Sequence, residues 1–503
     1  IMLQMQDKKL DLAAKQLAEM QKVAAKQPLT VYLTALIAFN KKDLAAASSA
    51  VENLLKIQPD NPQGLQLAGA IAYQKQSDIQ AQDSLSKALK KSPGLDYSRR
   101  LLVKSYLRSK QPAKALATLQ PVLQGTAVPP AWLTLAGEVY MQNGDAERAA
   151  EFFSQAAKHD PKDSKAKTAL ALSQMNLGHT AQAFADLEQI AASDSGVTAD
   201  MALIASAMRQ KDFDKALQAI ANLEKKQPNS PLVHNLRGQV LVAKKDSPAA
   251  KKSFEKALAE DPTYLSAVTN LVAMDLAENK IDQARQRYET VLAKDPKNVP
   301  AMLSLAQLKA RTGASLDDVA SLLKKAVAAD SSNPAPRFAL MSLYLNAKDK
   351  DKARATTEEA LAAFPENPEI LSVAGQVYQL SGDTNQALTT YNKLTNLLPT
   401  NPQPYLRIAE MHLAAKNKQA ARDILAKGIG KQPDSLPLQR AQIMLDVADE
   451  RFSDALTTAR AIQKTQPKEA AGYVLEGDIH LTKKSWKDAA TAYRAGLKAA
   501  PTT

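Results

Sequence analysis

The sequence predicts an all-α solenoid built from about fourteen pairs of short antiparallel helices. Two observations carry this prediction: a proline recurs about every 34 residues, and an alanine recurs twelve residues before each of these proline marks. Composition agrees, because alanine is abundant and aromatic residues make up only 5% of the chain. Alanine is the strongest helix former and allows close helix contact. Such a chain favours many small helical units over a few large cores.

The proline marks set the period. Counted back from the end of the chain, the gaps are 34 residues except for one of 35 and one of 33, and eleven of the fourteen marks are proline. A period of 34 is the length of two short helices and two turns. Proline ends the second helix and favours an extended turn before the next unit. The marks are Pro59, Pro93, Ala127, Pro161, Ser195, Pro228, Pro262, Pro296, Ser331, Pro365, Pro399, Pro433, Pro467 and Pro501.

The alanine marks hold at thirteen of fourteen positions, with Val319 as the exception. We predict that each alanine lies where the second helix crosses the first, because only a small side chain lets the two backbones approach. The first helix often carries a glycine at its own contact point, and a large residue often follows the alanine by four places. These residues are Gly69, Gly137, Gly238, Gly375 and Gly477, and Phe153, Phe254, Tyr288, Tyr391 and Tyr493.

Two markers in phase over fourteen units make the whole chain resemble the tetratricopeptide repeat (TPR). The resemblance implies a right-handed superhelical solenoid, continuous over residues 1–503. Residues 1–28 would form a frayed partial repeat, and full repeats would run over about 28–501. The start of the chain has the pattern of the middle of a helix, so we expect this sequence to be a fragment of a longer protein.

No catalytic constellation occurs along the chain. Without cysteine, disulfides, thiolate metal sites and cysteine nucleophiles are excluded. The five histidines fall in distant repeats without paired spacing, and no GxxxxGK, GxGxxG or GxSxG motif is present. A helical array also lacks the enclosed pocket that most enzymes use. We therefore predict a binding protein that is not an enzyme and needs no cofactor or metal.

Positive charge gathers near the start of the chain. The net charge is +13, and the first 120 residues hold 18 basic and 9 acidic residues. The binding surface of a TPR array is the groove lined by the first helix of each repeat. In the repeat after Pro93, that helix face carries residues at i, i+3, i+7 and i+11. They are Tyr97, Arg100, Lys104 and Arg108.

This basic face is the strongest candidate site in the sequence. Between Lys90 and Lys114 there are eight basic residues and one acid, Asp96. The face is suited to clamping carboxylates or phosphates through charge-assisted hydrogen bonds. A merely solvated basic surface explains the same pattern, and both interpretations stay open at this point.

A second candidate is a pair of amides in the repeat after Pro228. Asn235 and Gln239 are four residues apart and share one predicted helix face. Two amides on a groove can grip an extended peptide backbone or sugar hydroxyls, whereas packing or water contact accounts for them equally well.

Five further stretches stand out beyond the repeat pattern. They are Leu67-Ala68-Gly69-Ala70, Asn235-Leu236-Arg237-Gly238, Arg311-Thr312-Gly313-Ala314, Pro336-Arg337-Phe338-Ala339-Leu340 and Gly472-Tyr473-Val474-Leu475-Glu476-Gly477-Asp478. In order and spacing they resemble the long TPR lipoproteins of the bacterial exosortase (XrtA)/PEP-CTERM system, the PrsT-like family. The order covers most of the chain, and no single stretch is specific.

This resemblance implies a non-catalytic scaffold beside exopolysaccharide biosynthesis and export and PEP-CTERM protein sorting. It implies a periplasmic protein, lipid-anchored to the outer membrane through a signal not contained in this sequence. Expected partners are proteins of the envelope biosynthesis machinery or acidic polysaccharide, with no nucleic acid and no other membrane contact. The alternatives are a cytosolic TPR adaptor or co-chaperone that binds carboxylate-ended peptides, and the regulatory arm of an enzyme encoded further along the chain.

Overall fold

The computed structural model describes residues 1–7, 9–125 and 127–500, and within them it contains 30 α-helices and no strand. Contacts divide the chain into two compact units, residues 1–261 and 262–503. The boundary falls between two repeats, at the Pro262 mark.

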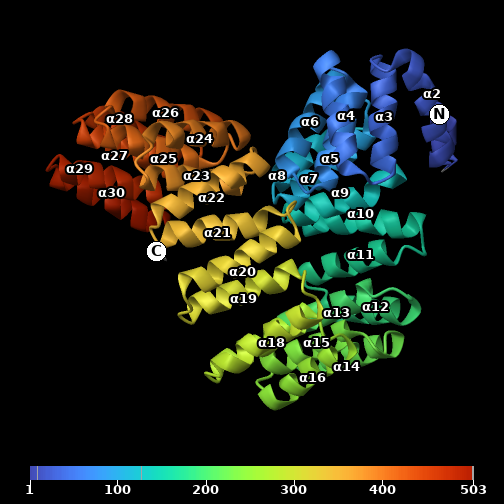
Figure 1. The fold of residues 1–503 in the computed structure, drawn as a ribbon. Coiled ribbons are helices and arrows are strands. Elements are labelled where there is room, and N and C mark those ends of the chain that lie inside the picture. The colour runs from blue at the N-terminus through green and yellow to red at the C-terminus, as the bar shows by residue number, and fades with distance from the viewer. Residues whose placement is uncertain (8, 126, 501–503) are drawn as a thin grey trace. The chain divides into compact units, whose positions relative to one another are not determined.

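The first unit begins with α1 and α2 and continues with seven helix pairs (Figure 1). Its helices are α1 Met2–Gln6, α2 Leu10–Ala24, α3 Pro28–Asn40, α4 Leu44–Ile57, α5 Pro62–Gln74, α6 Asp78–Lys91, α7 Asp96–Arg108, α8 Pro112–Leu123, α9 Pro130–Gln142, α10 Ala146–His159, α11 Ser164–Asn176, α12 Thr180–Ser193, α13 Thr198–Arg209, α14 Phe213–Lys226, α15 Pro231–Ala243 and α16 Ser247–Glu260.

The second unit contains seven more pairs. Its helices are α17 Leu265–Ala277, α18 Ile281–Lys294, α19 Val299–Arg311, α20 Leu316–Ala329, α21 Pro334–Asn346, α22 Lys350–Ala363, α23 Pro368–Leu380, α24 Thr384–Leu397, α25 Pro402–Ala414, α26 Lys418–Lys431, α27 Leu436–Ala448, α28 Phe452–Thr465, α29 Ala471–Thr482 and α30 Trp486–Ala499. The fourteen pairs of the described chain confirm the predicted fold class and repeat number.

The recurring alanines form the contact between the helices of each pair. Twelve of the thirteen are completely buried, Ala489 is 3% exposed, and Val319 is 3% exposed at the exceptional position. Ala13 in α2 is also completely buried, and it lies one period before Ala47. The alanine pattern therefore begins one repeat earlier than the sequence analysis recognised.

The glycines and the large residues of the sequence pattern pack against each other. A Cβ atom on Gly137 would lie 2.5 Å from the ring of Phe153, and one on Gly238 would lie 2.4 Å from the ring of Phe254. Leu85 packs in the same way on Gly69, at 2.5 Å. In each case the larger residue lies 16 places after the glycine, so each pair joins the two helices of one repeat.

Each proline mark lies in the turn between repeats. Pro59 is two residues beyond the end of α4, and the same spacing holds for the other nine proline marks that the structure describes, while Pro501 lies outside the described residues. Asn61 then caps α5, because its Oδ1 atom accepts a hydrogen bond from the Gly64 amide at 2.8 Å, and Pro62 occupies the first helical position.

The turn inside each repeat uses one residue in the left-handed backbone region. Only four of these fourteen residues are glycine, and the other ten have φ between 54° and 66°. Seven of the ten are lysine, which is an unusual residue for a conformation that favours glycine. They are Lys42, Lys110, Lys211, Lys245, Lys348, Lys416 and Lys484.

Changing Lys416 to glycine is expected to stabilise the repeat of α25 and α26 by about 1 kcal/mol, because glycine adopts φ > 0 without steric cost. Lys427→Gly is the matched control, since Lys427 is exposed in the interior of α26. There the same change should cost about 1 kcal/mol. Hydrogen exchange of the α25 and α26 amides measures both values. Equal destabilisation by the two changes would contradict the prediction.

Candidate binding groove

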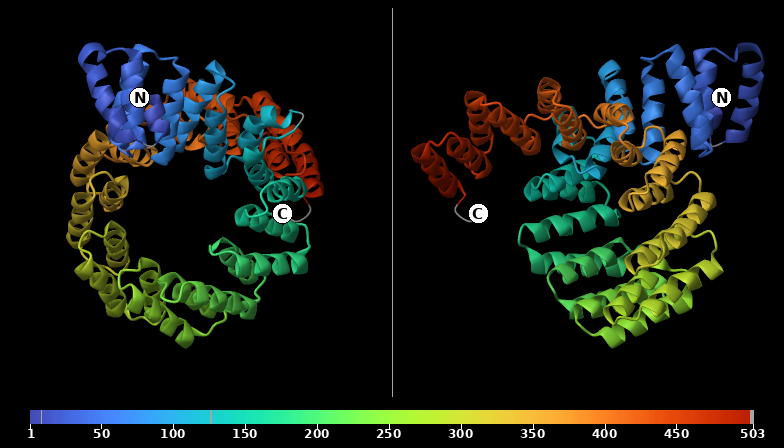
Figure 2. Two further views of the ribbon diagram at one scale, coloured as in Figure 1. Left: turned by 90° about the vertical axis from the view of Figure 1, so that its right-hand side faces the viewer. Right: turned by 60° about the vertical axis from the view of Figure 1, so that its left-hand side comes forward.

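First helices of adjacent repeats pack directly on one another. In the first unit α5 contacts α7 and α7 contacts α9, and in the second unit α21 contacts α23. Second helices of adjacent repeats have far fewer contacts over the described residues. The repeats are therefore closer on the first-helix side, which forms the inner face of each unit. Figure 2 shows the stacked pairs from two further sides. We call this inner side the groove face.

The predicted basic residues lie on α7 in the first unit. Tyr97 is 44% exposed, Lys104 and Arg108 are exposed, and Arg100 is half-buried. Partial burial raises the pKa of the Tyr97 hydroxyl, and the positive charge of Arg100 opposes this shift. Tyr97 therefore remains a neutral hydrogen-bonding group beside the charged residues.

Arg108 is occupied by the preceding repeat. Its guanidinium lies 3.9 Å from the centre of the Tyr73 ring and donates hydrogen bonds to the Asp78 carboxylate at 2.7 to 3.0 Å and to the Tyr73 carbonyl at 2.9 Å. The bond to Asp78 raises the pKa of Arg108. Its geometry is that of a staple between α7 and the α5–α6 turn.

The other two basic residues also have acidic neighbours. Arg100 lies 3.3 Å from Asp96, whose carboxylate also accepts a hydrogen bond from the Trp132 ring nitrogen at 2.9 Å. Burial raises the pKa of Glu138 in α9, and the positive charge of Lys104 opposes that shift. Much of the positive charge on this face is therefore balanced by neighbouring repeats.

The sequence analysis missed these acidic partners. Glu138 lies 34 residues after Lys104, so the repeat register places the two at equivalent positions on neighbouring first helices. Asp78 lies 30 residues before Arg108, and the same spacing joins Lys41 to Asp11 at 3.0 Å. A search for opposite charges at 30 and 34 residues would have found both.

The amide pair of α15 does not face solvent together. Asn235 is 3% exposed and takes part in an interaction, whereas Gln239 is exposed. The preceding residue, His234, is 1% exposed, and burial lowers its pKa. Asn235 therefore belongs to the packed interior of this repeat, and Gln239 alone reaches the surface.

A cavity on the groove face of the second unit was not predicted. It measures about 410 Å³ and lies among α21, α23, α24 and α25. Its lining is mainly apolar with a polar rim: Phe338, Pro368, Glu369, Ser372, Gln376, Tyr391, Leu394, Leu398, Asn401, Gln403, Pro404 and Arg407. Burial raises the pKa of the Tyr391 hydroxyl to about 12, and Arg407 opposes the shift. That hydroxyl therefore keeps its proton at physiological pH.

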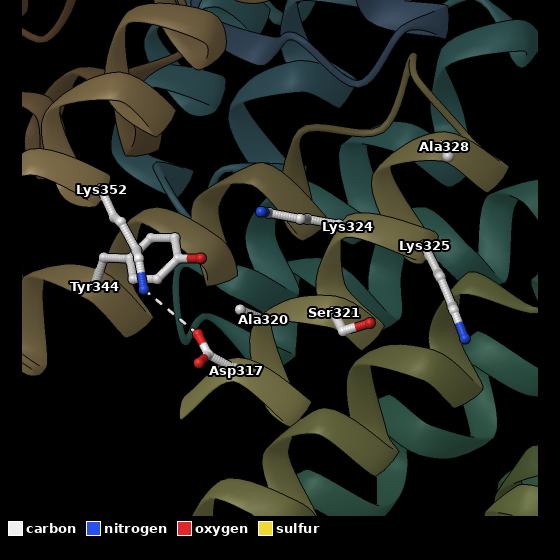
Figure 3. Close-up of a pocket in the computed structure, with 8 residues that line it drawn as sticks. All are labelled: Asp317, Ala320, Ser321, Lys324, Lys325, Ala328, Tyr344 and Lys352. Carbon is white, nitrogen blue, oxygen red and sulfur yellow. Dashed lines mark hydrogen bonds and ion pairs between the residues drawn. The ribbon is translucent and has the colours of Figure 1, made fainter. Parts of the chain in front are cut away.

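A second hollow, of about 520 Å³, lies over α20 and beside Tyr344 and Lys352. Figure 3 shows the Lys352 amine directed at Asp317 beside the Tyr344 ring. The amine is 3.4 Å from Asp317 and 3.5 Å from Asp349. The hollow is the space left where second helices spread apart, and its central charge is already paired.

Two searches of the described residues gave no site. No group of three or more histidine, cysteine, aspartate or glutamate side chains is arranged to hold a metal ion. No helix is both long and apolar enough to cross a membrane.

Sequence relatives share the repeat. Over 265 residues, 51% of this chain, the sequence is 27% identical to cellulose synthase operon protein C of Xanthomonas axonopodis pv. citri, and the match covers 17% of that protein. Over 109 residues, 21% of this chain, it is 28% identical to pre-mRNA-splicing factor 6 of Saccharomyces cerevisiae, covering 12% of that protein. The matches thus span less than a fifth of the length of these curated relatives.

Among solved structures, the chain is similar to one described as Naa15/Naa10 bound to HypK-THB. The identity is 15%, the TM-score is 0.42, and the alignment covers 100% of this chain and 93% of that one.

Two family models described as tetratricopeptide repeat match the chain. One covers residues 241–308 and 314–377, and the other covers 100–164, 168–231, 201–264 and 440–502. Together they cover well over half of the chain, in register with the helix pairs of the structure. The chain therefore belongs to the tetratricopeptide-repeat family, whose stacked helix pairs form scaffolds for protein interaction.

Proposed function

We propose that this chain is a non-catalytic scaffold of the bacterial cell envelope that works beside exopolysaccharide biosynthesis and export and PEP-CTERM protein sorting. The observation that carries the proposal is the groove face of each unit, an open surface formed by adjacent first helices. The similarity to a protein named for a cellulose synthase operon supports the link to polysaccharide. The resemblance to PrsT-like lipoproteins supports the periplasmic, lipid-anchored location.

In the first unit, the proposed ligand is an acidic polysaccharide or an acidic segment of an envelope protein. Arg100 and Lys104 are the residues that would contact it, since Arg108 is tied to Asp78. Tyr97 lies on the same face and offers a neutral hydroxyl. Arg100 would exchange its 3.3 Å contact with Asp96 for the ligand, so binding should be moderate in strength and sensitive to salt.

Reversing the charge of Arg100 and Lys104 together, by Arg100→Glu and Lys104→Glu, should weaken binding of an acidic polysaccharide by at least about tenfold, because each change replaces attraction by repulsion. The probe is polygalacturonate, measured by biolayer interferometry at several salt concentrations. The matched control is Lys110→Glu with Lys114→Glu, which makes the same change in net charge at the α7–α8 turn and on α8.

Weaker binding of the first variant alone would support the basic face as the site. Equal binding by both variants and the wild type would contradict it, and equal loss in both would reduce the effect to net charge alone. Fractionation of cells that express the full-length gene product tests the location. Recovery in the cytosolic fraction without lipidation would contradict the envelope assignment and favour a cytosolic adaptor.

A further inference from the structure

We propose that the cavity around Tyr391 binds an extended, uncharged peptide segment, which places an apolar side chain on Leu394 and Leu398 and a backbone carbonyl against the Tyr391 hydroxyl. This inference rests on the proposed role as a protein-binding scaffold. It assigns a protein ligand to the second unit, separate from the acidic ligand of the first.

The hydroxyl of Tyr391 has no hydrogen-bond partner among the residues that the structure describes, although the residue is only 2% exposed. Buried polar groups in folded proteins are nearly always paired, because an unpaired one loses its hydration without compensation. Tyr391 lines the cavity. A ligand in the cavity is therefore in position to supply the missing partner.

Two other tyrosines at the same repeat position show what the hydroxyl would bond to. The Tyr493 hydroxyl donates to Asp478 at 2.7 Å, and the Tyr288 hydroxyl lies 3.5 Å from the Thr269 hydroxyl. Asp478 is 15 residues before Tyr493, and Thr269 is 19 residues before Tyr288, both on first helices. The hydroxyl at this position therefore reaches the groove side of its repeat.

In the repeat of Tyr391, the two equivalent positions are Gln376 and Ser372, and both line the cavity. Gln376 instead directs its amide nitrogen to the Ser372 carbonyl, at 3.4 Å. Phe153 and Phe254 occupy the tyrosine position in two other repeats, so packing against the glycine needs no hydroxyl. The hydroxyl of Tyr391 is thus dispensable for the fold and unpaired within the chain.

The cavity chemistry favours a peptide over a charged polymer or a glycan. Leu394, Leu398, Pro368 and Pro404 offer an apolar surface, against which sugar hydroxyls would be desolvated without partners. An apolar side chain gains free energy there. Amide side chains at the rim suit the regularly spaced donors and acceptors of a peptide backbone.

The charges at the rim argue for an uncharged segment. Arg407 donates to Glu410 at 3.0 Å, and Glu369 lies elsewhere on the cavity lining. The rim therefore has no excess positive charge with which to attract an acidic chain.

The test selects short random peptides by display on the full-length chain and measures the enriched peptides by fluorescence anisotropy. Tyr391→Phe should weaken their binding about tenfold or more, the effect of one lost hydrogen bond to a buried group. Tyr493→Phe is the matched control and should leave peptide binding unchanged. Hydrogen exchange of the α23 and α24 amides should be unchanged or slower in Tyr391→Phe.

Several results would overturn the inference: no peptide is enriched, enriched peptides bind Tyr391→Phe as well as the wild type, or Tyr391→Phe accelerates exchange as an internally bonded hydroxyl would. Cellohexaose is tested in parallel, and binding of this neutral glycan in place of peptide, lost in Tyr391→Phe, would also overturn it. The polygalacturonate assay on Arg100 and Lys104 is independent, so failure of either proposal can be recognised separately.

Discussion

Replacing Arg287 by methionine is expected to destabilise the repeat of α17 and α18 by about 3–5 kcal/mol at neutral pH, because the change leaves a buried carboxylate without its partner. The Asp275 side chain is 1% exposed, and its carboxylate accepts hydrogen bonds from Arg287, the side chain of which is 20% exposed. The ion pair joins the first and second helices of one repeat.

The pH dependence of this variant checks the cause. Without Arg287, the pKa of Asp275 in the folded chain should rise above its unfolded value, since burial disfavours the charged form. An acid with a raised folded pKa binds its proton more strongly in the folded state, so the deficit should shrink as pH falls through that raised value. A deficit that stays constant between neutral and acidic pH would contradict the unpaired charge as the cause.

Two further variants complete the experiment. Asp275→Leu combined with Arg287→Met should be less destabilised than Arg287→Met alone, because the double change removes the unpaired charge. Lys41→Met is the surface control: its partner Asp11 has a side chain that is 93% exposed, so the loss should be below about 1 kcal/mol. Hydrogen exchange within the affected repeat is the measurement, since stability in a repeat array is local.

Changing Gly137 to alanine is expected to destabilise the repeat of α9 and α10 by about 2–3 kcal/mol. The new Cβ atom would lie 2.5 Å from the ring of Phe153, which is 2% exposed and cannot move into solvent. Overpacking of this kind forces side chains out of their rotamers or shifts the backbone. The loss should outweigh the gain of about 1 kcal/mol that alanine brings to a helix interior.

Gly430→Ala is the matched control. Gly430 lies inside α26, and a Cβ atom there would meet nothing within 4 Å. The substitution should therefore stabilise α26 by about 1 kcal/mol, as propensity alone dictates. Adding Phe153→Ala to Gly137→Ala should cost less than the sum of the two single changes. If Gly137→Ala and Gly430→Ala had the same sign, close helix contact would not be the reason for Gly137.

The repeat register predicted more of the site than single residues did. It placed Tyr97, Arg100 and Lys104 on one face of α7, and it contains the relation between Lys104 and Glu138. It did not show that Arg108 is held by Asp78, because the side chain turns back toward the preceding repeat. For Asn235, spacing gave the helix face but not the burial, which depends on how neighbouring helices cover that face.

The turns show a similar division. Gly144 and Gly382 mark turns that are recognisable in the sequence, whereas the seven lysines in the left-handed region carry no such signal. The conformation of these lysines follows from the need to reverse the chain between two packed helices, and packing overrides the local preference. The missing partner of the Tyr391 hydroxyl is likewise a property of the folded repeat, since Tyr288 and Tyr493 occupy the same sequence position.

The sequence by itself determined the fold class, the number of helix pairs and the residues that join them, because small side chains at a fixed period leave one way to bury fourteen amphipathic pairs. The tertiary structure alone decided which charges are neutralised and which polar groups stay unpaired. Those outcomes depend on the directions of side chains from neighbouring repeats, over distances of a few ångströms that a 34-residue period does not specify.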